Sequence, residues 1–142
     1  MSAKRLAILL EIEARMQSLA GVNEVLLNAS GDPSQFPAIF IDDAGHTPDS
    51  TTEPGATRYD MAVTIEGFVE NDGGSAATAA INALYLSVVE ALIQEPALDG
   101  LVEIINEGPM RMQTVALGKQ RRMGFALDLE IQFVADRQSP AV

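Results

Sequence analysis

The stretch from Tyr59 to Glu70 alternates apolar and polar side chains with a period of two, which is the period of a pleated strand. The apolar positions are Tyr59, Met61, Val63, Ile65 and Val69. Because the polar side chains point the other way, the pattern predicts a strand with one face in a core and one face outside it. A second such strand is predicted from Met123 to Phe133, where apolar residues occupy every odd position.

Two helices are predicted from apolar residues that recur three and four positions apart. The first runs from Leu6 to Leu19, and its stripe is widened by Ile8 and Leu10, so we expect it to touch more than one neighbour. The second follows the turn Asn71-Asp72-Gly73-Gly74 and runs from Ser75 to Gln94. Its stripe consists of Ala77, Ile81, Leu84, Val88 and Leu92.

The rest of the chain reads as short strands and loops. The predicted extended segments are Val22 to Leu27, Ala38 to Ile41, Leu101 to Ile105 and Met110 to Leu117. A long polar loop is predicted from Asp42 to Arg58, a hairpin tip at Gly118-Lys119-Gln120, and a frayed tail at 136–142. This order predicts an α+β fold, a mainly antiparallel sheet with both helices on one face, in a single domain of residues 1–142.

The charge of the chain limits the classes of molecule that it is expected to bind. The formal net charge is −11, so an electrostatic grip on nucleic-acid phosphates or anionic lipid is not expected. Cysteine is absent, which excludes thiolate chemistry. No secretory signal core and no segment of about 20 apolar residues is recognised, and we expect no membrane contact.

The sequence contains no recognisable catalytic motif. The loop around His46 offers oxygens and a nitrogen, but its spacing is not that of an EF-hand, and a solvated loop is the simpler interpretation. Gly73-Gly74 lacks the phosphate-binding fingerprints, and no serine lies in a nucleophile elbow. We therefore predict a protein that is not an enzyme, with no catalytic residues, cofactor or metal.

Three groups of residues remain as candidates for contact. The acidic positions opposite the predicted core are Asp60, Glu66, Glu70, Asp128 and Glu130. They form either an ordinary solvent-exposed sheet face or a face whose negative charge has a function. The candidates for contact with a partner, or for solvated turns, are His46, Asp49, Arg58, Lys119, Arg121 and Arg122. The candidates for an interface between subunits are Leu6, Ile8 and Leu10.

The layout of the chain resembles the tail terminator proteins of long-tailed bacteriophages, the superfamily of the lambda tail terminator. The likeness rests on the first helix, the segment Phe36-Pro37-Ala38-Ile39, the polar loop, the strand and long helix from Tyr59 to Gln94, the segment Leu98-Asp99-Gly100-Leu101-Val102, and the alternating last strand.

The resemblance implies a structural subunit made in the host cytoplasm and located at the tail neck of a virion. It would form a homohexameric ring that caps the tail tube, ends its polymerisation and joins a head-completion or stopper protein. DNA would pass an acidic channel without specific binding. The alternatives are a stopper or head-completion ring, a tail tube subunit or, in a different class, a small ligand-binding regulatory domain.

Overall fold

The computed structural model describes residues 4–49, 56–70, 74–117 and 120–136. Its elements are α1 (Lys4–Gln17), β1 (Glu24–Leu27), β2 (Ala38–Pro48), β3 (Ala56–Glu70), α2 (Gly74–Leu92), the 3-10 helix η1 (Ala97–Gly100), β4 (Ile104–Leu117) and β5 (Gln120–Asp136). The strands form one five-stranded sheet in the order β1-β2-β3-β5-β4. Only β1 and β2 run parallel, and the other neighbours are antiparallel.

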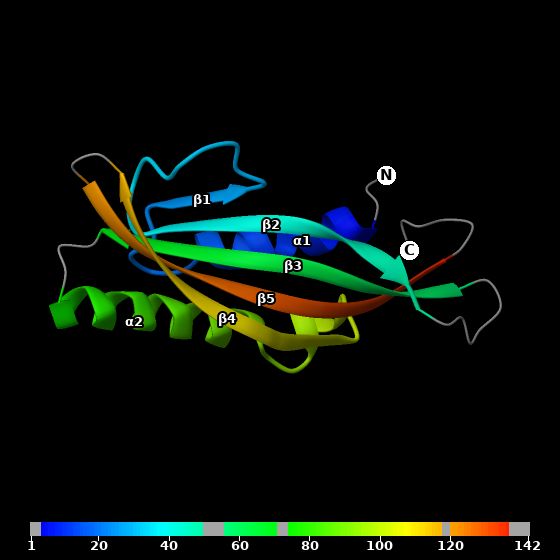
Figure 1. Cartoon of the computed structure of the whole chain (residues 1–142). Coiled ribbons are helices and arrows are strands. Elements are labelled where there is room, and N and C mark those ends of the chain that lie inside the picture. The colour runs from blue at the N-terminus through cyan, green and yellow to red at the C-terminus, as the bar shows by residue number, and fades with distance from the viewer. Residues whose placement is uncertain (1–3, 50–55, 71–73, 118–119, 137–142) are drawn as a thin grey trace.

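Both helices lie on the same side of the sheet, which Figure 1 shows with the strands passing in front of α1 and with α2 alongside. The predicted α+β fold with a mainly antiparallel sheet and two helices is therefore confirmed. The two strands with the clearest alternation, β3 and β5, are central neighbours and pair along their whole length from Ala56↔Asp136 to Glu70↔Arg122.

The core lies between the helices and the sheet. The odd-numbered residues of β3 and β5 face it, as their alternation predicted, and Ile65, Leu127 and Ile131 are completely buried. The helices contribute Ile8, Leu9, Ile12 and Met16 from α1, and Ala77, Ile81, Leu84, Val88 and Leu92 from α2. Gly67 also faces the core, where the Phe125 ring occupies the space of a Cβ and Leu84 Cδ2 would lie 3.0 Å from one. A larger residue there would displace the Phe125 ring.

The predicted loop from Asp42 to Arg58 is wrong over most of its length. β2 continues to Pro48 through an irregularity between Asp43 and His46, and β3 already begins at Ala56. Polar side chains do not prevent this, because strand pairing uses backbone groups, and β3 offers a neighbour throughout. His46 therefore belongs to a strand, opposite Met61.

The strand predicted from Met110 to Leu117 and the last two residues of the one predicted from Leu101 to Ile105 belong to a single strand, β4, whereas residues 101–103 precede it and are not in a strand. The register of β4 on β5 shifts between Glu107 and Met110. Gly108 and Pro109 occupy this bulge, where a proline that cannot donate a backbone hydrogen bond is tolerated. The break in the sequence pattern thus marks a bulge within β4.

A second, smaller apolar cluster lies on the other face of the sheet. Phe40 and Phe68 meet edge to face with ring centroids 5.3 Å apart, beside Ala38. Ala29 and Phe36, from the connection between β1 and β2, pack against them. This connection therefore covers one end of the face that lacks helices.

Candidate functional site on the open face of the sheet

The open face is the side of the sheet that faces away from α1 and α2. Even-numbered residues of β3 and β5 point to it, so the pleat places the predicted acidic residues together on this side. These are Asp60, Glu66 and Glu70 of β3 and Asp128 and Glu130 of β5. Asp42 of β2 joins them, because Phe40 and Asp42 alternate with the core residues Ile39 and Ile41.

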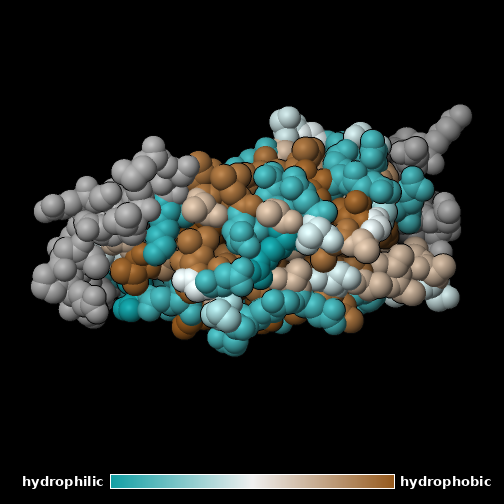
Figure 2. All heavy atoms as spheres, turned by 180° about the vertical axis from the view of Figure 1, so that it is seen from behind, coloured by the Kyte–Doolittle hydropathy of each residue, from teal (hydrophilic) through white to brown (hydrophobic). Residues whose placement is uncertain are grey.

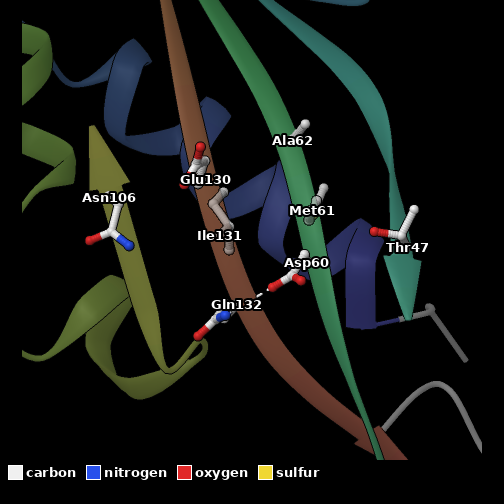
Figure 3. Close-up of a pocket in the computed structure, with 8 residues that line it drawn as sticks. All are labelled: Thr47, Asp60, Met61, Ala62, Asn106, Glu130, Ile131 and Gln132. Atoms are coloured by element: carbon white, nitrogen blue, oxygen red, sulfur yellow. Dashed lines mark hydrogen bonds between the residues drawn. The ribbon is translucent and has the colours of Figure 1, made fainter. Parts of the chain in front are cut away.

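A shallow hollow of about 440 Å³ lies on this face. Asp60, Glu130 and Gln132 point into it, with Asn106 on one side and Thr47 on the other (Figure 3). Gln132 Nε2 donates to Asp60 Oδ1 at 2.9 Å. Its lining is mixed, because Met61, Ala62 and Ile131 lie beside the polar residues. The two carboxylates make the hollow unfavourable for a bound anion.

Asp128 is paired with a cation that the sequence analysis did not assign to this face. Arg111 of β4 binds both carboxylate oxygens of Asp128, at 2.6 and 3.3 Å, and the Thr64 hydroxyl donates to Oδ1 at 2.9 Å. The hydrogen bond from Arg111 is the main cause that lowers the pKa of Asp128. The alternation of Met110 and Met112 with Arg111 was the sequence signal that could have placed this guanidinium on the open face.

Glu66 and Asp42 form a carboxyl pair across β3 and β2. A side-chain hydrogen bond with Asp42, together with burial and the like charge of Asp42, raises the pKa of Glu66 to about 7. Arg122 and Arg111 act in the opposite direction. Two carboxyl groups can share a hydrogen bond only through a proton, so near neutral pH this pair carries less negative charge than its two residues suggest.

Arg122 does not extend into solvent at the hairpin, and its candidacy as an exposed partner contact is wrong. Its side chain is 14% exposed, because it lies over the Phe68 ring, 5.2 Å from the centroid, and binds Asp32 at 2.8 Å. It holds the β1–β2 connection on the open face. Lys119 and the side chain of Arg121 lie outside the described residues.

The other partner-contact candidates lie at the opposite end of the sheet. His46 is exposed and meets the Tyr59 ring edge to face at 4.7 Å. Arg58 binds Glu103 with two hydrogen bonds of 2.8 and 3.1 Å, and the Asp49 N–H donates to the carbonyl oxygen of Arg58. Arg58 lies about 40 Å along β3 from Glu70, the residue that pairs with Arg122, so the candidates that the structure describes do not form one surface.

The three interface candidates of α1 differ in their exposure to solvent. Leu6 and Leu10 are 40% and 45% exposed, whereas Ile8 is completely buried in the core. The prediction for Ile8 is wrong, because its position on the helix turns it toward the sheet together with Ile12. Figure 2 views this helix-bearing face and shows apolar side chains exposed among polar ones.

Among the described residues, no group of three or more His, Asp and Glu side chains is placed to hold a metal ion. The expectation that no segment is long and apolar enough to cross a membrane is wrong, since Gly74–Gly100 meets both criteria. Core helices of globular proteins also meet them, and α2 packs Ile81, Val88 and Leu92 into the core. Only 28% of the most apolar part is buried, so α2 leaves an apolar surface outside.

Comparison with known proteins finds a likeness in fold. No protein-family model matches the sequence, and no curated protein matches it either. The fold is similar to that of a chain in the structure titled "Virion of native gene transfer agent (GTA) particle". The TM-score is 0.56 at 12% identity, over 89% of this chain and 96% of that chain. The likeness thus shows that nearly the entire fold also occurs in a chain of a virus-like particle.

Proposed function

We propose that this protein is a structural virion component of the tail terminator type. Its subunits assemble into a hexameric ring that caps the tail tube, ends tube polymerisation and joins the tail to the head or neck. The observation that carries this proposal is the fold shared with a chain of the gene transfer agent virion across almost the full length of both chains. The layout that resembles tail terminators supports it.

The open face supports the proposal through its charge. In a ring, the hollow between Asp60 and Glu130 and the neighbouring carboxylates would line the channel. DNA phosphates within the Debye length of about 10 Å would be repelled, so DNA would pass without binding. The Arg111–Asp128 and Asp42–Glu66 pairs moderate this repulsion, because one is an ion pair and the other shares a proton near neutral pH.

The decisive experiment deletes the gene for this protein and images the particles that are then assembled by electron microscopy. A terminator that ends polymerisation leaves tails with tubes longer than normal and not joined to heads. Normal-length tails beside heads that lose DNA would instead identify a stopper or head-completion ring. Normal infectious particles would overturn the structural role.

A second measurement addresses the ring itself. Light scattering over a series of protein concentrations, followed by negative-stain images of the largest species, is expected to give rings of six subunits with a central hole. The variant with Glu66→Lys and Glu130→Lys should still form rings but yield particles of reduced infectivity. Unchanged infectivity of this variant would contradict the assignment of the open face to the channel.

A further inference from the structure

Arg122 of β5 has hydrogen-bonding groups that the fold leaves unused. Its Nη2 atom donates to Asp32 at 2.8 Å, and its guanidinium lies over the Phe68 ring. The Nε and Nη1 atoms are buried as well, yet neither has a hydrogen-bond partner among the residues that the structure describes. A buried N–H group without an acceptor is unfavourable, because it has lost its bonds to water and gained none in return. An acceptor that reaches this guanidinium would therefore stabilise it.

Glu66 is the carboxyl group placed to reach Arg122. Glu66 and Phe68 are two residues apart on β3, so both point to the open face at a separation of about 7 Å. The guanidinium over the Phe68 ring is thus close to Glu66. The next residues of β5 on this face are Gly124 and Ala126, which lie opposite these two residues of β3. Because both are small, no bulky side chain of β5 separates Glu66 from the guanidinium.

A proton holds Glu66 on the side of β2. Protonated Glu66 donates to the Asp42 carboxylate, and this hydrogen bond is the main cause that raises the pKa of Glu66 to about 7. Arg122 is the cation that opposes the rise most, ahead of Arg111. Arg111 already binds both carboxylate oxygens of Asp128. Arg122, with its unused N–H groups, is therefore the better partner for an ionised Glu66.

We propose that Glu66 exchanges partners with pH: its protonated carboxyl group binds Asp42, and its carboxylate turns to the unused N–H groups of Arg122. We call this exchange the Glu66 switch. In the ionised arrangement Arg122 joins Glu66 of β3 to Asp32 of the β1–β2 connection, so the connection is held more firmly on the open face. The switch is a property of the single subunit and does not depend on the proposed ring.

The surrounding charges determine the direction of the change. The nearest charged groups on this face are Asp42 of β2, Glu70 of β3, Arg111 of β4, Arg122 and Asp128 of β5, and Asp32 of the connection. Because the pKa of Glu66 is raised in the folded state, the stability that its proton provides is present below about pH 4.5 and is lost as the pH rises through about 7. The bond to Arg122 limits this loss without reversing it. The connection becomes better held even though the whole chain becomes slightly less stable.

The side-chain Nε–H signal of Arg122 in NMR spectra of the full chain tests the switch. Between about pH 5.5 and pH 8 we expect this signal to shift in the wild type with a midpoint near 7. It should not shift in Glu66→Gln, which keeps a donor for Asp42 but cannot ionise.

Glu70→Gln is the matched control, since Glu70 is the carboxylate directly opposite Arg122 in the strand register. The Arg122 signal of this variant should shift as in the wild type. A shift that is lost in Glu70→Gln and kept in Glu66→Gln would overturn the switch. A constant Arg122 signal in the wild type, while the Glu66 carboxyl carbon titrates, would overturn it as well.

Asp42→Asn tests the other arrangement of the switch. Without the Asp42 carboxylate the pKa of Glu66 should fall toward 4.5, so the Arg122 signal should already stand at its high-pH position at about pH 6. A signal that still moves with a midpoint near 7 in this variant would contradict the exchange of partners.

Hydrogen exchange measures the hold on the β1–β2 connection. The Ser34 N–H lies in this connection and donates to Glu24 Oε1 at 3.2 Å. Its protection factor, corrected for the intrinsic effect of pH, should rise about threefold to tenfold between about pH 5.5 and pH 8 in the wild type and stay constant in Glu66→Gln. Equal protection at both pH values in the wild type would overturn the effect on the connection.

Discussion

The two faces of the central sheet are built from alternate residues of the same strands, yet they have opposite properties. On the helix-bearing face, Ile65 and Leu127 are completely buried. Their neighbours on the open face, such as Asp60 and Glu130, are exposed. The comparison teaches that stability and surface charge are encoded separately in β3 and β5, because the pleat sends successive side chains to opposite sides. The charge of the open face can therefore change with little effect on the core.

The open face is itself divided. Where the β1–β2 connection covers it, Phe40 and Phe68 form a small apolar cluster that Arg122 shields. Where it is uncovered, carboxylates surround a hollow. Between these regions, two pairs join acidic side chains to a cation or to each other: Arg111 with Asp128, and Asp42 with Glu66. Acidic residues on this face thus differ in the charge that they present to a partner.

The largest expected effect tests the separation of the two faces. Truncating Phe125→Ala on the helix-bearing face removes a ring that is 1% exposed and should lower the free energy of unfolding by about 3–5 kcal/mol. Glu130→Ala, five residues along the same strand on the open face, should change it by no more than about 0.5 kcal/mol. Urea denaturation of both variants measures the contrast. Comparable losses would contradict the division of roles between the faces.

A smaller effect, dependent on pH, tests the carboxyl pair. The pKa of Glu66 is about 7 in the folded state against an ordinary 4.5, so the folded state holds this proton more tightly. The stability that the proton provides is complete below about pH 4.5 and is lost as the pH rises to about 7. We expect a loss of about 1 kcal/mol, reduced by solvent screening at this partly exposed site.

Glu66→Gln keeps a hydrogen-bond donor for Asp42 but cannot titrate, so its stability should not fall in that pH window through this group. Asp42→Asn should also remove the fall, because it takes away the main cause of the raised pKa. Denaturation midpoints measured at intervals between pH 4 and pH 8 provide the comparison. A wild-type fall that persists in both variants would exclude the pair as its origin.

The smallest expected effect concerns the ion pair on the open face. Arg111→Gln removes the main cause of the lowered pKa of Asp128, so this pKa should rise toward 3.8. The stabilising contribution of Asp128 is present above its unfolded pKa and is lost as the pH falls through the folded one. Overall stability should change little, since exposed ion pairs contribute little.

A titration of the carboxyl carbon signals by NMR measures this change. Arg58→Gln is the matched control at the far end of the sheet, and it should raise the pKa of its own partner, Glu103, while leaving that of Asp128 in place. A shift of Asp128 in the Arg58 variant would show that the charges of the sheet act collectively and not in local pairs.

Much of the fold was predictable from the chain because its central elements have a strict period. The alternation in β3 and β5 indicated which side chains enter the core, and the stripe of α2 named its five buried residues. The acidic side chains of the open face followed from the same alternation. These predictions need only the geometry of a single strand or helix, and that geometry is local in the sequence.

Features that depend on contacts between residues far apart in the sequence could be seen only in the structure. The polar segment from Asp42 to Pro48 is a strand because β3 pairs with it, and the interruption at Gly108 and Pro109 is a bulge because β5 continues beside it. The register of β5 between β3 and β4 brings Arg111 to Asp128, whereas burial against the sheet assigns Ile8 to the core. A sequence specifies which faces are apolar, but cross-strand neighbours depend on register, which is fixed only when the whole sheet assembles.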